Sequence, residues 1–137
     1  MSRDSVERQA FETYLTGFHC AEVISKTIVE ILGNNHSQDI PIVASGFGGG
    51  IGSSKEDVCG ILTGGVIALG WLYGRSEPGA DITKLKDLTG AFRKRFIERI
   101  GSTKCPEILK KLGEQEKMIK CKKLTAEMTG ALWEIIG

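Results

Sequence analysis

The chain has 137 residues, with 18 basic and 17 acidic side chains and a formal net charge of +1. This near-zero balance argues against a nucleic-acid-binding protein, which needs a basic surface to displace counterions from phosphates. The length and the 41% of apolar residues fit a single domain over residues 1–137. Two counts are unusual: there are four cysteines, and the 18 glycines are about twice the average share.

The N-terminal part of the chain is predicted to be helical. Apolar residues recur at intervals of three and four from Val6 to Ile31, which is typical of one helical stripe. A capping box formed by Asp4 and Glu7 is expected to start this stretch, and Gly17 is predicted to break or bend it into two helices. Residues 33–54, rich in glycine, asparagine and serine, are predicted to form a loop.

The rest of the chain is also predicted to be helical. Helices are expected over 57–73, from about 81 to 101, from 105 to 113, and from about 125 to the end. A segment that carries Cys121 is expected to precede the last helix. The predicted fold is therefore all-α: a single compact bundle of about five to six helices, with the glycine-rich loop between the first helical pair and the central helix.

The sequence also predicts a cellular compartment. The first eight residues are polar and lack the apolar core of a secretory signal, and the longest apolar run, 61–72, is too short to span a bilayer. We therefore expect a cytoplasmic protein that does not insert into a membrane, the alternative being a mature form from which a signal has been removed. In a reducing cytoplasm, cysteines are more often metal-binding or redox-active than joined in structural disulfides.

The segment 46–52 contains five glycines in seven residues, so its backbone can adopt positive φ angles and approach other groups closely. It lacks the Gly-Lys-Ser/Thr ending of a nucleotide-binding loop, which argues against that function. Two interpretations stay open: a tight connector, or a backbone wrapped around a cofactor with its N–H groups pointing inward. The second makes five glycines candidate cofactor-binding residues: Gly48, Gly49, Gly50, Gly52 and Gly60.

Small residues also form a ridge along the central helix, where Gly60, Gly64 and Ala68 are spaced four residues apart. Glycine inside a helix costs about 1 kcal/mol relative to alanine, so a close contact is expected to offset this cost. Either a neighbouring helix of the same chain or the same helix of a second copy is expected to pack here. A homo-oligomer formed through this ridge is the predicted assembly.

The four cysteines, Cys20, Cys59, Cys105 and Cys121, include no Cys-x-x-Cys pair. Their spacing excludes a thioredoxin-type active site, an ordinary zinc knuckle, a ferredoxin pattern and covalent haem attachment. Three of them are predicted to lie near helix starts or lysines, which favour the thiolate. All four are therefore candidate catalytic residues and candidate metal ligands, if the fold gathers them.

Together these features resemble the C_GCAxxG_C_C family, small proteins with four cysteines and a Cys-Gly-Ala-x-x-Gly core, to which a redox role is ascribed. The resemblance extends over 17–21, 46–52, 58–66, Cys105 and Cys121. Ile61 stands where the core motif of the family has alanine. The resemblance implies a helical redox protein that carries an iron–sulfur cluster or another metal centre.

Three hypotheses for the function follow from these observations. The leading one is an electron-transfer protein in which the four cysteines converge on an iron–sulfur cluster or another metal centre and exchange electrons with a redox partner protein. The first alternative is a metal-free protein whose cysteines cycle between thiol and disulfide. The second is a non-catalytic, dimeric helical interaction domain in which the cysteines are simply packed. The positions of the four thiols in the fold distinguish among them.

Overall fold

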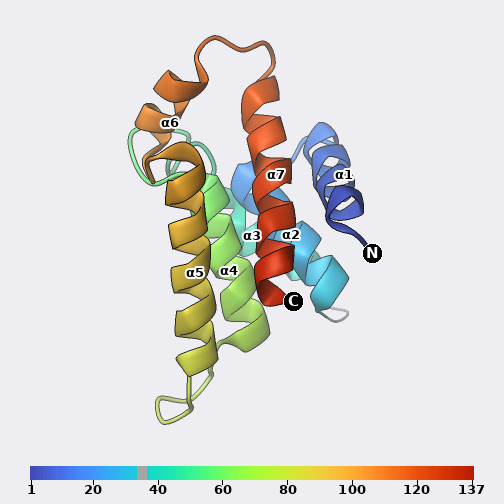
Figure 1. Ribbon diagram of the computed structural model, residues 1–137. Coiled ribbons are helices and arrows are strands. Elements are labelled where there is room, and N and C mark those ends of the chain that lie inside the picture. Colours follow the sequence, from blue (N-terminus) through green and yellow to red (C-terminus); the bar gives the residue numbers. More distant parts are fainter. Residues whose placement is uncertain (34–36) are drawn as a thin grey trace.

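The computed structural model describes residues 1–33 and 37–137, so residues 34–36 of the predicted loop lie outside the described residues. Within these ranges the helices are α1 (Arg3–Leu15), α2 (Cys20–Leu32), α3 (Ile40–Ala44), α4 (Gly60–Tyr73), α5 (Thr83–Ile100), α6 (Cys105–Leu112) and α7 (Ile119–Ile136) (Figure 1). The all-α prediction is confirmed, although these seven helices exceed the expected five to six. No helix in the described part of the chain has both the length and the apolar character that a membrane-spanning segment needs.

The main core lies between α2, α4, α5 and α7. Ile24 and Ile28 of α2 and Phe92 and Phe96 of α5 belong to this core, and all four side chains are fully buried. Burying a side chain of this size stabilises the fold by about 1.5–3 kcal/mol. α2 and α4 form the most extensive helix pair, while α1 lies along α7. α6 and the glycine-rich loop lie together at one end of this bundle (Figure 1).

The start of α1 differs from its prediction. The capping box is formed by Ser2 and Ser5 rather than by Asp4 and Glu7. The Ser5 amide donates to Ser2 Oγ over 3.2 Å, and the Ser2 amide donates to Ser5 Oγ over 2.9 Å. The carboxylate of Glu7 accepts instead from Arg3 Nε over 2.8 Å, so it is not available to the helix terminus. The helix therefore begins closer to the N-terminus than predicted.

The glycine-rich region contains more helix than predicted. The break at Gly17 is confirmed, since this residue has a φ of +119° and separates α1 from α2. The short helix α3, however, lies within the segment predicted to be a loop. Pro41 lies in its first turn, where a missing N–H costs nothing. Ile40 and Ala44 are fully buried, and α3 packs against α2, which stabilises so short a helix.

The central helix starts later than predicted, at Gly60 rather than at Asp57. The amide of Cys105 donates to the Asp57 carbonyl and the amide of Cys59 donates to the Thr103 carbonyl, both over 2.7 Å. The residues just before the helix are therefore extended and paired with a distant segment. An isolated antiparallel bridge between Val58 and Lys104 belongs to the same pairing. This pairing places two cysteine-bearing segments side by side.

The last helix begins earlier than predicted, at Ile119 rather than near Thr125, so Cys121 lies in its first turn. Met118 immediately before it has a left-handed φ of 60°, which marks a sharp change in the direction of the chain. Gln115 Oε1 accepts from the amide of Cys121 over 3.0 Å, which satisfies one of the free N–H groups at the helix start.

The ridge of small residues on α4 is buried within the chain. A Cβ atom added to Gly64 would lie 2.6 Å from Cγ2 of Ile24 and 2.7 Å from Cα of Ala21, both on α2. Ala68, further along the ridge, is fully buried. The ridge therefore packs on a neighbouring helix of the same chain, one of the two expected contacts. A homo-oligomer stays a prediction, but these three positions present no open surface to a second copy.

Candidate functional site

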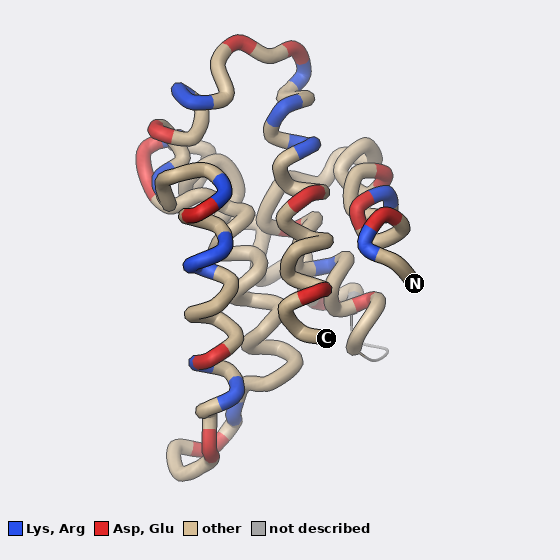
Figure 2. Tube along the Cα trace, viewed as in Figure 1, with Lys and Arg blue, Asp and Glu red and all other residues tan. Residues whose placement is uncertain are grey.

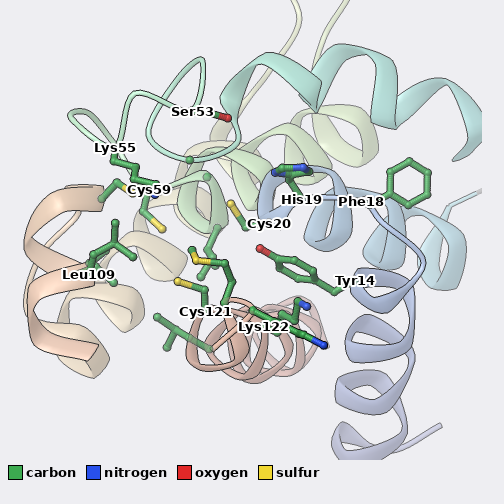
Figure 3. A pocket seen from close by; sticks show the side chains of 18 of the residues that line it. Tyr14, Phe18, His19, Cys20, Ser53, Lys55, Cys59, Leu109, Cys121 and Lys122 are labelled. Atoms are coloured by element: carbon green, nitrogen blue, oxygen red, sulfur yellow. The ribbon is translucent and has the colours of Figure 1, made fainter. Parts of the chain in front are cut away.

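A cavity of about 440 Å³ lies at the end of the bundle formed by α6 and the glycine-rich loop (Figure 3). All four cysteines line it, and each is at the N-terminal end of a different helix. Cys20 and Cys105 are the first residues of α2 and α6, Cys59 immediately precedes α4, and Cys121 lies in the first turn of α7. The tertiary structure therefore gathers four cysteines that are far apart in the sequence.

Cys20 and Cys59 lie where α2 meets α4. A Cβ atom on Gly60 would be only 2.5 Å from Sγ of Cys20, so glycine at this position makes room for the thiol. Burial raises the pKa of both thiols, and that of Cys59 reaches about 12 because the neighbouring Cys20 adds its charge. Backbone N–H groups oppose these shifts by stabilising the thiolates. They belong to Gly49 and Ala21 beside Cys20, and to Ile61 and Leu62 beside Cys59.

Cys105 and Cys121 complete the set of thiols on the side of α6 and α7. Burial raises the pKa of both, and neighbouring cysteines raise that of Cys105 further. The positive charge of Lys55 acts on both thiols in the opposite direction and lowers their pKa. The side-chain amide of Gln115 donates to Sγ of Cys121 over 3.3 Å and has the same effect on that thiol. This pair is therefore the one with side-chain groups that favour a thiolate.

Tyr14, which belongs to the apolar helical stripe predicted between Val6 and Ile31, also lines the cavity. Its side chain reaches from α1 toward the cysteines (Figure 3), and Nζ of Lys122 lies 5.6 Å from the centre of its ring. Burial, followed by the charges of the cysteines with Cys20 first, raises its pKa. The phenol of Tyr14 therefore stays protonated beside the thiols at neutral pH. The break at Gly17 was the available signal, because it places α1 beside the first cysteine.

The glycine-rich loop has an unusual backbone. Residues 49–53 all have positive φ, between 56° and 73°, and they include Ile51 and Ser53. The turn is closed by the amide of Ser53 donating to the Gly48 carbonyl over 3.0 Å and that of Lys55 donating to the Gly49 carbonyl over 2.7 Å. A left-handed conformation costs a residue with a side chain about 1–2 kcal/mol. Residues with strained backbone of this kind are common at the functional sites of proteins.

The five candidate glycines take different places around the cysteines. Gly49 and Gly60 line the cavity. Gly50 lies behind Cys105, because a Cβ atom on it would be 2.8 Å from Cβ of Cys105, and Gly48 packs against His19. Gly52 borders open space. Three of the five therefore allow a close approach of the backbone to a cysteine or to the cavity, and a direct role in binding a cofactor stays a prediction.

The charged side chains that the described residues contribute to the cavity wall are all positive. Three lysines line it, Lys55, Lys117 and Lys122, whereas no aspartate or glutamate from the described ranges does so. Elsewhere the two charges are mixed along the surface (Figure 2). The positive ends of four helix dipoles also converge on the cavity, and each end is equivalent to about half an elementary charge. The cavity is therefore suited to negatively charged groups, including thiolates.

The four thiols are free, and no three His, Cys, Asp or Glu side chains among residues 1–33 and 37–137 are grouped closely enough to hold a metal ion as they stand. A single ion would need sulfur ligands within about 2.3 Å. A polynuclear cluster spaces its ligands more widely, and four cysteine thiolates are its usual donor set. The thiols, arranged around open volume with N–H groups beside two of them, fit such a cluster better than a single ion.

The fold and the site place this protein in the class of all-helical proteins that have four cysteines around one cavity. A family model described as "Putative redox-active protein (C_GCAxxG_C_C)" matches residues 18–135, and the chain belongs to this family. The match includes all four cysteines and begins shortly after Tyr14. Ile61, which departs from the core motif of the family, lines the cavity and is buried. Among curated proteins and among solved structures, no match was found.

Proposed function

We propose that this redox-active protein binds an iron–sulfur cluster between Cys20, Cys59, Cys105 and Cys121 and uses it for electron transfer. The observation that carries this proposal is the convergence of four free thiols on one cavity from the starts of four helices. A bound cluster would supply a one-electron carrier, and cysteine thiolates are its usual ligands. The redox partner protein, the homo-oligomer and the cytoplasmic location stay predictions.

The surroundings of the thiols support this proposal. Four thiolates around one centre repel one another and lose hydration when they are buried, so they need compensating positive charge. The chain supplies it through helix N-termini and Lys55, and through N–H groups such as those of Ile61 and Leu62 beside Cys59. Hydrogen bonds to the sulfurs also raise the potential of a bound cluster. Tyr14 and the apolar side chains of the wall restrict water around it.

Anaerobic reconstitution of the purified protein with iron and sulfide tests the proposal. We expect a coloured protein with visible absorption and a fixed ratio of iron and sulfide to chain. Cys59→Ser should lower that ratio strongly, because it removes one of four ligands. Met118→Leu is the matched control, because Met118 also carries sulfur and lines the cavity but has a thioether in place of a thiol. A colourless, iron-free protein after reconstitution would refute the proposal, as would equal iron content in both variants.

A metal-free thiol–disulfide function is the second candidate. It is favoured by Cys105 and Cys121, which line the same cavity and are both influenced by Lys55. In this reaction the two thiols would form one disulfide, while an external disulfide takes up the two electrons and two protons and becomes two thiols. Counting free thiols before and after exposure to a small disulfide tests it. A loss of two thiols per chain is expected, and four thiols that stay free would exclude this function.

A further inference from the structure

Three positively charged side chains line the cysteine cavity, and no acidic side chain from the described part of the chain does so. Lys55 comes from the glycine-rich loop, Lys117 from the turn before α7, and Lys122 from α7 itself. None of the three forms an ion pair with a described residue, whereas Arg3 and Arg99 each have a carboxylate partner. Three lysines without an ion-pair partner among the described residues therefore line one cavity.

The position of the thiols indicates that a small molecule, rather than the surface of another protein, reaches them. Cys59 and Cys105 are only 6% and 8% exposed, so a flat protein surface cannot touch them. The volume of about 440 Å³ lies within the range of small-molecule binding sites, about 300–1,000 Å³. Phe18 and Leu109 add apolar side chains to the wall (Figure 3), which suits a molecule with an uncharged portion beside its charged group.

We propose that the cavity admits small anions, molecules that carry a carboxylate or another oxyanion group, to the cysteine thiols, and that Lys55, Lys117 and Lys122 select them. The positive ends of the four helices act in the same direction as the lysines. The inference deepens the proposed redox function by naming the class of small molecule that reaches its cysteines. It depends only on the free thiols and the lysines, so it can be tested without a cluster.

Two alkylating reagents of nearly the same size provide the test, iodoacetate and iodoacetamide. Each forms a carbon–sulfur bond with a cysteine thiolate and releases iodide, but only iodoacetate is an anion. The rate of each reaction is measured at each cysteine of the reduced, metal-free protein by peptide mass spectrometry. The ratio of the two rates is then divided by the same ratio for the chain unfolded in urea. A change in thiol pKa cancels in this ratio, because both reagents attack the same thiolate.

The expected ratio is well above one. A lysine about 8 Å from the reagent favours the anion by roughly twofold in water, so three lysines give about tenfold at low ionic strength. Salt at 1 M should bring the ratio close to one, because the Debye length falls to about 3 Å. A ratio near one in the folded protein at low salt would overturn the proposal. So would a ratio that does not change with salt.

Charge-neutralising variants assign the effect to the three lysines. The variant K55Q/K117Q/K122Q should lower the ratio by about tenfold. The matched variant K84Q/K86Q/K94Q removes the same charge from α5 and should leave the ratio unchanged. Equal ratios in the two variants would overturn the proposal. The single variant K55Q, with an expected twofold decrease at Cys105 and Cys121, gives the same decision if the triple variant does not fold. The outcome is separate from reconstitution, since a protein that binds no iron can still prefer the anion.

Discussion

Replacing Gly64 by alanine is expected to push α2 and α4 apart and to destabilise the protein. The added Cβ atom would lie 2.6 Å from Cγ2 of Ile24 and 2.7 Å from Cα of Ala21. Carbon atoms in favourable contact are about 3.5–4.0 Å apart, so the two helices would have to separate by roughly 1 Å. One of the atoms that must move belongs to the backbone of α2, which a side-chain rotation cannot relieve.

The magnitude follows from two opposing effects. Overpacking a well-packed core costs about 1–3 kcal/mol, and occasionally more. Alanine in the middle of a helix gains about 1 kcal/mol over glycine. Because the contact involves the backbone of the most extensive helix pair, we expect the upper part of the range and a net loss of about 2 kcal/mol in the free energy of unfolding.

Gly70→Ala is the matched control, since Gly70 lies in the same helix and a Cβ atom there meets nothing within 4 Å. It should therefore raise the free energy of unfolding by about 1 kcal/mol through helix propensity alone. Urea unfolding followed by circular dichroism measures both variants against the parent. If Gly64→Ala is as stable as Gly70→Ala, α2 and α4 do not approach each other closely at Gly64 in solution, and the reasoning is refuted.

Two other predictions concern the cysteine site. The stability of the reduced, metal-free protein should fall as the pH rises from about 9 toward 12, because folded Cys59 keeps its proton up to a pKa of about 12 while the unfolded thiol loses it near 9.0. Urea unfolding at pH 8.5 and 10.5 should show a smaller fall for Cys59→Ala than for the parent, and equal falls would contradict the cited shift. Ile51→Gly should raise the free energy of unfolding by up to about 1 kcal/mol. Glycine relieves about 1–2 kcal/mol of strain in the left-handed backbone at φ 67°, but it loses about 0.5–1 kcal/mol more conformational entropy on folding. Ile42→Gly, at an exposed position in α3, should instead destabilise the protein in the same assay, and two changes of equal sign would argue against strain at Ile51.

The helices themselves were largely predictable, because apolar side chains at three- and four-residue intervals bury one face whatever the neighbouring helix is. Their starts were less so. The start of α4 depends on hydrogen bonds between 57–59 and 103–105, and such distant pairing leaves no local signal. Similarly, the side-chain amide and carbonyl of Gln115 support Cys121 at the start of α7 from six residues away.

The candidate site was predictable in its residue types and not in its geometry. Four cysteines and a cluster of glycines identified the chemistry, and the glycines indicated close approach of the backbone. The sequence could not show that Gly60 faces Cys20 while Gly50 faces Cys105, because each contact joins two segments that only the folded chain brings together. Lys55 and Tyr14 were missed for the same reason, since neither is next to a cysteine in the sequence.

The order of residues along the chain was enough to predict a helical protein, four cysteines outside every short metal or disulfide motif, and glycines concentrated around Cys59. These properties follow from local periodicity and composition. Only the folded chain shows that the starts of α2, α4, α6 and α7 meet at one cavity and that, among the described residues, lysines alone supply its charged side chains. Helix packing sets these positions, because burial of the apolar faces orients each helix and thereby carries its first residues, with their thiols and free N–H groups, to a common point.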